Sequence, residues 1–73
     1  MAKIVINSTP QLISDGTKKT YVTSRAGYFK VIVSDTLPDK SSWHFEQKIY
    51  AENAKLWAWS DHGEVPVDVS TWR

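Results

Sequence analysis

The residues best suited to chemistry are few, and the most suggestive run is Ser60, Asp61 and His62. Serine, acid and histidine make up the hydrolytic triad, in which the imidazole must reach both partners. Consecutive residues in a turn cannot present their side chains in that geometry, and no glycine elbow surrounds a serine. His44 and Glu46 are spaced as a base and its orienting group would be, but a solvated strand face explains them equally well. The sequence therefore predicts no catalytic residue.

Metal and cofactor sites are also not predicted. The chain has 73 residues, no cysteine and two histidines, which excludes a thiolate zinc site and leaves too few nitrogen ligands for a cluster. Its three glycines, Gly16, Gly27 and Gly63, occur singly, so no phosphate-cradling loop is present. Because disulfides are impossible, a domain this small must depend on good packing or self-association for its stability.

Net charge and hydropathy limit the classes of partner that the protein can have. The formal net charge of +1 argues against a nucleic-acid partner. Three lysines and three tyrosines are nevertheless of the types that form a basic and aromatic platform for a single strand: Lys18, Lys19, Lys30, Tyr21, Tyr28 and Tyr50. Residues 1–30 carry about +4 and residues 31–73 about −3, which suits either ordinary solubility or complementary patches between subunits. The chain has no apolar run of about 20 residues, so no membrane span is expected. We expect the protein to be made in the cytosol and to stay there unless it is carried out inside a larger assembly.

The pattern of residues 55–69 predicts a β-hairpin. Two alternating segments flank a turn of aspartate, histidine and glycine. A three-residue turn with the glycine at positive φ would place Trp59 opposite Val65 and Trp57 opposite Val67, which gathers the large apolar groups on one face. A two-residue turn would mix the faces. The main alternative for this part of the chain is a helix across residues 52–60.

The remaining segments also favour strands. Alternation and turn residues predict extended segments at 3–7, 11–14, 19–23, 28–34, 43–50, 56–60 and 64–69. Residues 28–34 have apolar groups on both faces, as expected for the middle of a sheet. In residues 43–50 the pattern directs Trp43, Phe45 and Ile49 inward. Pro66 donates no ladder bond, so its strand is expected at an edge or bulged. We therefore predict one all-β domain over residues 1–73, a small antiparallel β-sandwich or barrel of six to seven short strands.

The four tryptophans are the clearest candidates for a binding surface. They either fill the core of the domain or are partly exposed for contact with another molecule. A two-residue turn after Tyr50 would leave Trp57 and Trp59 outside the main core. We predict an oligomer or partner interface made of Trp57, Trp59, Trp72 and Tyr50. A sugar-stacking platform is the alternative, which the scattered side-chain amides disfavour.

The order of these signals resembles small β-rich structural proteins of tailed bacteriophages. The resemblance is carried by Gln11-Leu12-Ile13-Ser14-Asp15-Gly16, Tyr21-Val22-Thr23, Gly27-Tyr28-Phe29-Lys30-Val31, Asp35-Thr36-Leu37-Pro38, Trp43-His44, Leu56-Trp57-Ala58-Trp59-Ser60 and Val65-Pro66-Val67-Asp68-Val69. It departs at Asn53-Ala54, where the pattern often has a glycine. The resemblance implies a virion component without enzymatic activity or small-molecule ligand, a capsid decoration, head fibre or tail appendage that works as a homo-oligomer, often a trimer. The alternatives are a phage-encoded inhibitor of a host enzyme and a carbohydrate-binding module.

Overall fold

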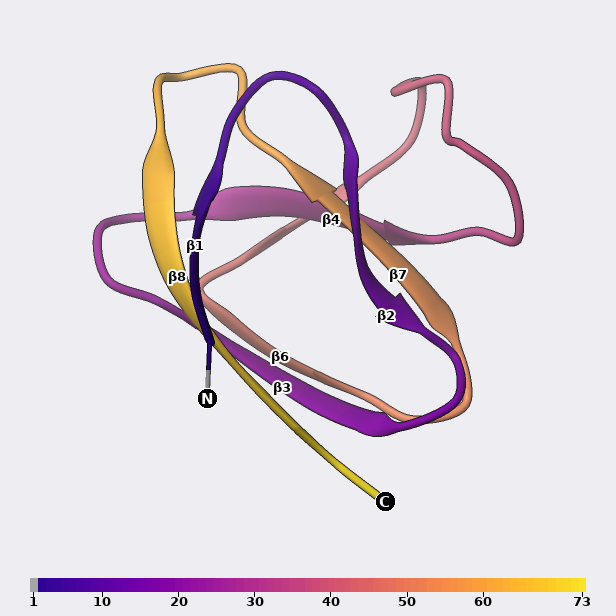
Figure 1. The fold of residues 1–73 in the computed structure, drawn as a ribbon. Coiled ribbons are helices and arrows are strands. Elements are labelled where there is room, and N and C mark those ends of the chain that lie inside the picture. The colour runs from indigo at the N-terminus through magenta and orange to yellow at the C-terminus, as the bar shows by residue number, and fades with distance from the viewer. Residues whose placement is uncertain (1) are drawn as a thin grey trace.

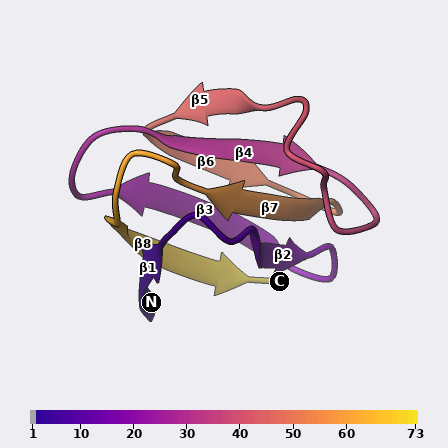
Figure 2. The ribbon, with the colours of Figure 1, turned by 90° about the horizontal axis from the view of Figure 1, so that it is seen from above.

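The strands of the chain divide between two antiparallel sheets. The structure is a computed structural model that describes residues 2–73, and within that range the regular elements are eight strands. They are β1 (Ala2–Ile6), β2 (Gln11–Asp15), β3 (Lys19–Ser24), β4 (Phe29–Val33), β5 (His44–Glu46), β6 (Lys48–Ala51), β7 (Lys55–Trp59) and β8 (Val65–Trp72). Sheet A has the order β1-β8-β3-β6 and sheet B the order β2-β7-β4-β5 (Figures 1 and 2). The prediction of an all-β fold is confirmed.

The chain changes sheet at almost every connection. Only β4 and β5 are both consecutive in sequence and paired in one sheet. Three hydrogen bonds join neighbouring connections at the corners: Ser60 N to Asn7 O (2.7 Å), Ser24 N to Gln47 O (2.7 Å) and Ser14 Oγ to Ala54 O (3.0 Å). Strands that bend from one sheet into the other are typical of packings in which the two sheets cross. Accordingly, β4 runs across the direction of β8 (Figure 1).

The hairpin predicted for residues 55–69 is not formed, although both of its strands are. β7 pairs with β2 and β4 in sheet B, whereas β8 pairs with β1 and β3 in sheet A. Trp57 therefore lies opposite Leu12 and Ile32 instead of a residue of β8. Gly63 has a φ of +98°, as the turn prediction requires, but the turn leads to the other sheet. The helix considered for residues 52–60 is also replaced by β7.

The core explains why the hairpin does not form. It lies between the sheets and takes one face of each: Ile6, Val22, Val65, Val67 and Val69 from sheet A, and Phe29, Val31, Leu56 and Ala58 from sheet B. On β7 the inward residues are thus the leucine and the alanine, and the two tryptophans point to the opposite face of sheet B. The prediction placed the tryptophans and valines on one face. In the structure the valine row of β8 packs across the core from the smaller side chains of β7.

Pro66 lies on an interior strand, so its predicted edge position is wrong. β8 is flanked by β1 and β3. The last pair between β3 and β8 is Ser24 with Val67, and the Pro66 carbonyl accepts a hydrogen bond from Arg25 N at 2.9 Å just beyond it. The missing proline N–H therefore falls where the ladder ends, and no central hydrogen bond is lost.

The segment predicted as one strand over residues 43–50 is divided at Gln47 between β5 and β6, which raises the number of strands from the predicted six or seven to eight. β4 does occupy the middle of a sheet, as predicted. On β5, Phe45 pairs with Lys30 and is 52% exposed, and Trp43 is 40% exposed. Both were predicted to point inward. They lie on the outer face of sheet B because Phe29 and Val31 take the inward positions of the neighbouring strand.

Candidate functional site

Three aromatic side chains gather on the outer face of sheet A. Thr20 and Val22 are buried, so Tyr21 between them points outward. Tyr21 pairs across the strands with Tyr50, and the Tyr50 ring stacks on Trp72 with centroids 5.9 Å apart and an interplanar angle of 29°. Tyr21, Tyr50 and Trp72 remain 37%, 48% and 44% exposed. We call these three residues the aromatic face.

An open polar hollow lies at the end of the aromatic face. Its volume is about 320 Å³, and it is lined by Thr17, Lys18, Lys19, Glu52, Asn53 and Arg73. Lys19 is the cross-strand partner of Trp72, and the Tyr50 hydroxyl donates to Glu52 Oε2 at 3.0 Å. Partial removal from water raises the pKa of Tyr50, and the hydrogen bond and negative charge of Glu52 raise it further. Two residues that line the hollow, Lys19 and Glu52, are therefore direct neighbours of the stacked rings.

The predicted interface of four residues is divided by the fold. Tyr50 and Trp72 lie together on sheet A, but Trp57 and Trp59 lie on the outer face of sheet B. Trp59 has no exposed surface, so the prediction that it contributes to a surface is wrong. Trp57 is half-buried, and its indole N–H donates to the Ser34 carbonyl at 2.9 Å.

The connection of residues 34–43, here called the strap, lies over part of the outer face of sheet B, the face on which Trp59 is buried. Lys30, which pairs with both Trp59 and Phe45, is buried on the same face. The Lys30 ammonium lies 4.4 Å from the centroid of the Trp43 ring and 5.8 Å from that of Phe45, within the range of cation–π attraction. The strap thus covers part of this face through Trp43 and Lys40.

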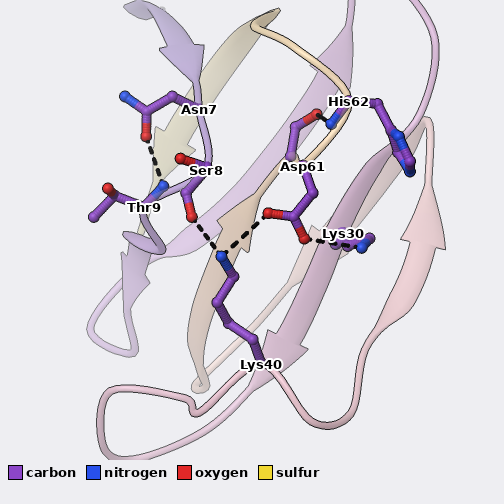
Figure 3. A network of polar contacts seen from close by, with 8 residues as sticks. Asn7, Ser8, Thr9, Lys30, Lys40, Asp61 and His62 are labelled. Carbon is purple, nitrogen blue, oxygen red and sulfur yellow. Dashed lines mark hydrogen bonds and ion pairs between the residues drawn. The ribbon is translucent and has the colours of Figure 1, made fainter.

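The carboxylate of Asp61 holds this arrangement together (Figure 3). Asp61 Oδ2 accepts from Lys30 Nζ at 3.0 Å, and Oδ1 accepts from Lys40 Nζ at 3.1 Å. Lys40 also donates to the Ser8 carbonyl at 2.7 Å. The two lysines, Lys30 first, lower the pKa of Asp61. The Asp61 carboxylate therefore links the strap and β4 to the connection after β7, and Lys40 adds the connection after β1.

The residues considered for chemistry do not form a reactive constellation in the described part of the chain. The Asp61 carboxylate binds lysines, and the His62 imidazole lies apart from it (Figure 3). The Ser60 hydroxyl accepts the His62 backbone N–H at 3.4 Å. His44 and Glu46 both lie on the short edge strand β5. Among residues 2–73, no three acidic or histidine side chains converge as a metal site requires.

Sequence reasoning missed Tyr21 as a member of the aromatic face. The alternation of Tyr21 with Thr20 and Val22 was a signal that its side chain points outward. Its cross-strand neighbour Tyr50, which makes it part of a cluster, depends on the order of strands in the sheet.

Comparison with family models, with curated proteins and with solved structures gives no match. Within the described residues, no helix is long and apolar enough to cross a bilayer.

Proposed function

We propose that the protein is a non-enzymatic structural module of a tailed-phage virion, a small β-sandwich that docks to a neighbouring virion subunit through the aromatic face. The observation that carries the proposal is the cluster of Tyr21, Tyr50 and Trp72 on the uncovered outer face of sheet A. The outer face of sheet B is covered in part by the strap, which is tied down through Lys40 and Asp61. The phage resemblance supplies the virion context.

The size of the aromatic face suits the centre of a protein contact. Aromatic side chains bury roughly 150–250 Å² each, so three that are 37–48% exposed offer on the order of 250 Å² of further burial. A stable interface buries about 800 Å² on each partner, with aromatic residues at its centre and polar residues at its rim. Lys19 and Glu52 beside the stack provide such a rim.

Co-sedimentation with capsids and tails purified from the phage that encodes the chain tests this function. The wild-type protein should sediment with the particles, and Trp72→Ala and Tyr50→Ala should reduce the bound fraction because they remove the stacked pair. Leu37→Ala is the matched control, since Leu37 is 66% exposed on the strap and away from sheet A. Wild-type protein that binds neither particle, or equal binding by Trp72→Ala and Leu37→Ala, would contradict the proposal.

A carbohydrate-binding module is the second candidate, and the polar hollow beside the stacked rings favours it. Sugar rings stack on exposed aromatic faces, while charged and amide side chains such as Lys19, Glu52 and Asn53 suit the hydroxyl groups. A glycan array would show binding that Trp72→Ala abolishes. An array without signal from the wild-type protein removes this candidate and leaves the docking function standing.

A further inference from the structure

Four strands form the edges of the two sheets, and three of them carry features that discourage pairing with another chain. On β1 the Val5 carbonyl accepts a hydrogen bond from Gln11 Nε2 at 3.0 Å. On β2 the register shifts between Leu12 and Ser14, as at a β-bulge. On β6 a lysine, Lys48, begins the strand. Side-chain blocking, bulges and lysines are the usual protections of edge strands.

β5 lacks these three devices and is guarded by its length of three residues and the charge of Glu46. Its sequence is His44-Phe45-Glu46, it pairs with β4 alone, and it lies at one margin of the molecule (Figure 2). Its outer side is apolar. Tyr28 and Phe45, which are 62% and 52% exposed, line an open hollow of about 300 Å³. An edge with a free backbone beside an apolar hollow is the feature that another short strand can occupy.

We propose that β5 pairs with β5 of a second copy of this chain, antiparallel and centred on Phe45. Sheet B would then continue through a two-fold axis from one copy into the other. In this register His44 lies opposite Glu46 of the partner subunit, and Glu46 opposite His44 of the partner subunit. An imidazole N–H donor therefore faces a carboxylate acceptor twice, and the edge is complementary to itself in hydrogen bonding.

The hydrogen-bonding pattern selects this register. A shift by one residue would place Phe45 opposite His44 of the partner subunit and mix the two faces of the sheet. A shift by two residues places like groups together, either His44 against its own copy or Glu46 against its own copy. The register centred on Phe45 is the one that keeps the faces and pairs a donor with a carboxylate acceptor.

The same register also partly covers the apolar hollow. Phe45 lies against its own copy on the outer face of sheet B, where Lys30 flanks it. Phe45 of the partner subunit then covers part of the hollow that Tyr28 and Phe45 line. Three paired residues supply few backbone hydrogen bonds, so burial of these rings provides most of the stabilisation.

Disulfide cross-linking tests the register directly, because the chain contains no cysteine. We would prepare His44→Cys and Glu46→Cys separately and oxidise each alone and as an equimolar mixture. The proposal expects the mixed disulfide to form faster than either homodimer, because residue 44 lies opposite residue 46. Equal rates in all three samples, or faster self-linking by either variant alone, would overturn the register.

Sedimentation equilibrium tests the contact itself. The wild-type chain should form a dimer, and Phe45→Lys should weaken it about tenfold or more because two lysines would then oppose each other. Leu37→Lys is the control for an exposed apolar residue elsewhere, and circular dichroism shows that each variant folds. A wild-type monomer at all concentrations, a trimer alone, or Phe45→Lys that behaves like Leu37→Lys would overturn the proposal. This contact goes beyond the docking function: Trp72→Ala should leave the dimer intact, and Phe45→Lys should leave Trp72-dependent docking intact.

Discussion

We expect Trp59→Phe to be more stable than Trp57→Phe, although Trp59 is the more deeply buried of the two side chains. Trp59 is completely buried, but its indole N–H has no hydrogen-bond partner. Trp57 is half-buried, and its indole N–H donates to the Ser34 carbonyl at 2.9 Å. A buried donor without a partner costs about 1–3 kcal/mol, whereas a made hydrogen bond contributes about 1 kcal/mol.

These magnitudes decide the comparison. Trp59→Phe leaves a cavity of roughly 40 Å³, which at about 24 cal/mol per Å³ costs about 1 kcal/mol. It also removes the unpaired donor, which returns about 1–3 kcal/mol. The free energy of unfolding should therefore stay unchanged or rise by up to about 2 kcal/mol. Trp57→Phe should lower it by about 1 kcal/mol, because it breaks a hydrogen bond that is made.

Urea unfolding followed by far-ultraviolet circular dichroism measures the difference. With a slope of about 1 kcal/mol per molar urea, a change of 1 kcal/mol moves the midpoint by about 1 M. Phenylalanine is the right replacement because Trp59→Ala would cost about 3–5 kcal/mol, much of the total expected for a domain this small. If Trp59→Phe is the less stable of the two variants, the Trp59 N–H has a partner and the reasoning fails.

Three further predictions concern single residues. The two lysine partners of Asp61 lower the pKa of its carboxyl group in the folded protein. Asp61 therefore stabilises the fold at pH values above its unfolded pKa of about 4, and this stabilisation is lost as the pH falls through the folded pKa. Asp61→Asn should flatten the acid limb of a plot of urea midpoint against pH, and an unchanged limb would contradict this. Gly63→Ala should lower the free energy of unfolding by about 1 kcal/mol because its φ is +98°, whereas Asn53→Gly, at +56°, should not; equal urea midpoints would contradict this. Glu52→Gln should lower the pKa of Tyr50 in a spectrophotometric titration, since Glu52 helps to raise it, and an unchanged value would show that partial removal from water acts alone.

Much of the local structure could be predicted from the sequence. Alternation located the strands, and the turn at Gly63 has the expected positive φ. The pairing of those strands could not be predicted, because a hairpin and a corner that changes sheet use the same turn residues. The choice depends on which face of β7 enters the core. Leu56 and Ala58 enter it, where they pack across the core from the valines of β8, which belongs to the other sheet.

The candidate site was predicted in part for the same reason. The stacking of Tyr50 on Trp72 joins β6 and β8, which are separated by β3 in the sheet order. Local pattern cannot show such a neighbour. The strap lies over part of the face on which Trp59 is buried, and its path over sheet B is fixed by Lys40 and its bonds to Ser8 and Asp61. Polar residues in a long connection gave no sign of this path.

The position of β8 in sheet A has a consequence for how the chain folds during its synthesis. β8 lies between β1 and β3, so β1 has no partner in its sheet until β8 has been made. Such long-range pairing is slow, because distant segments must meet before any contact rewards them. β3 and β6 pair with each other and do not need β8, so β1 is the strand of sheet A that must wait, and without β8 it would have nothing to bind in that sheet.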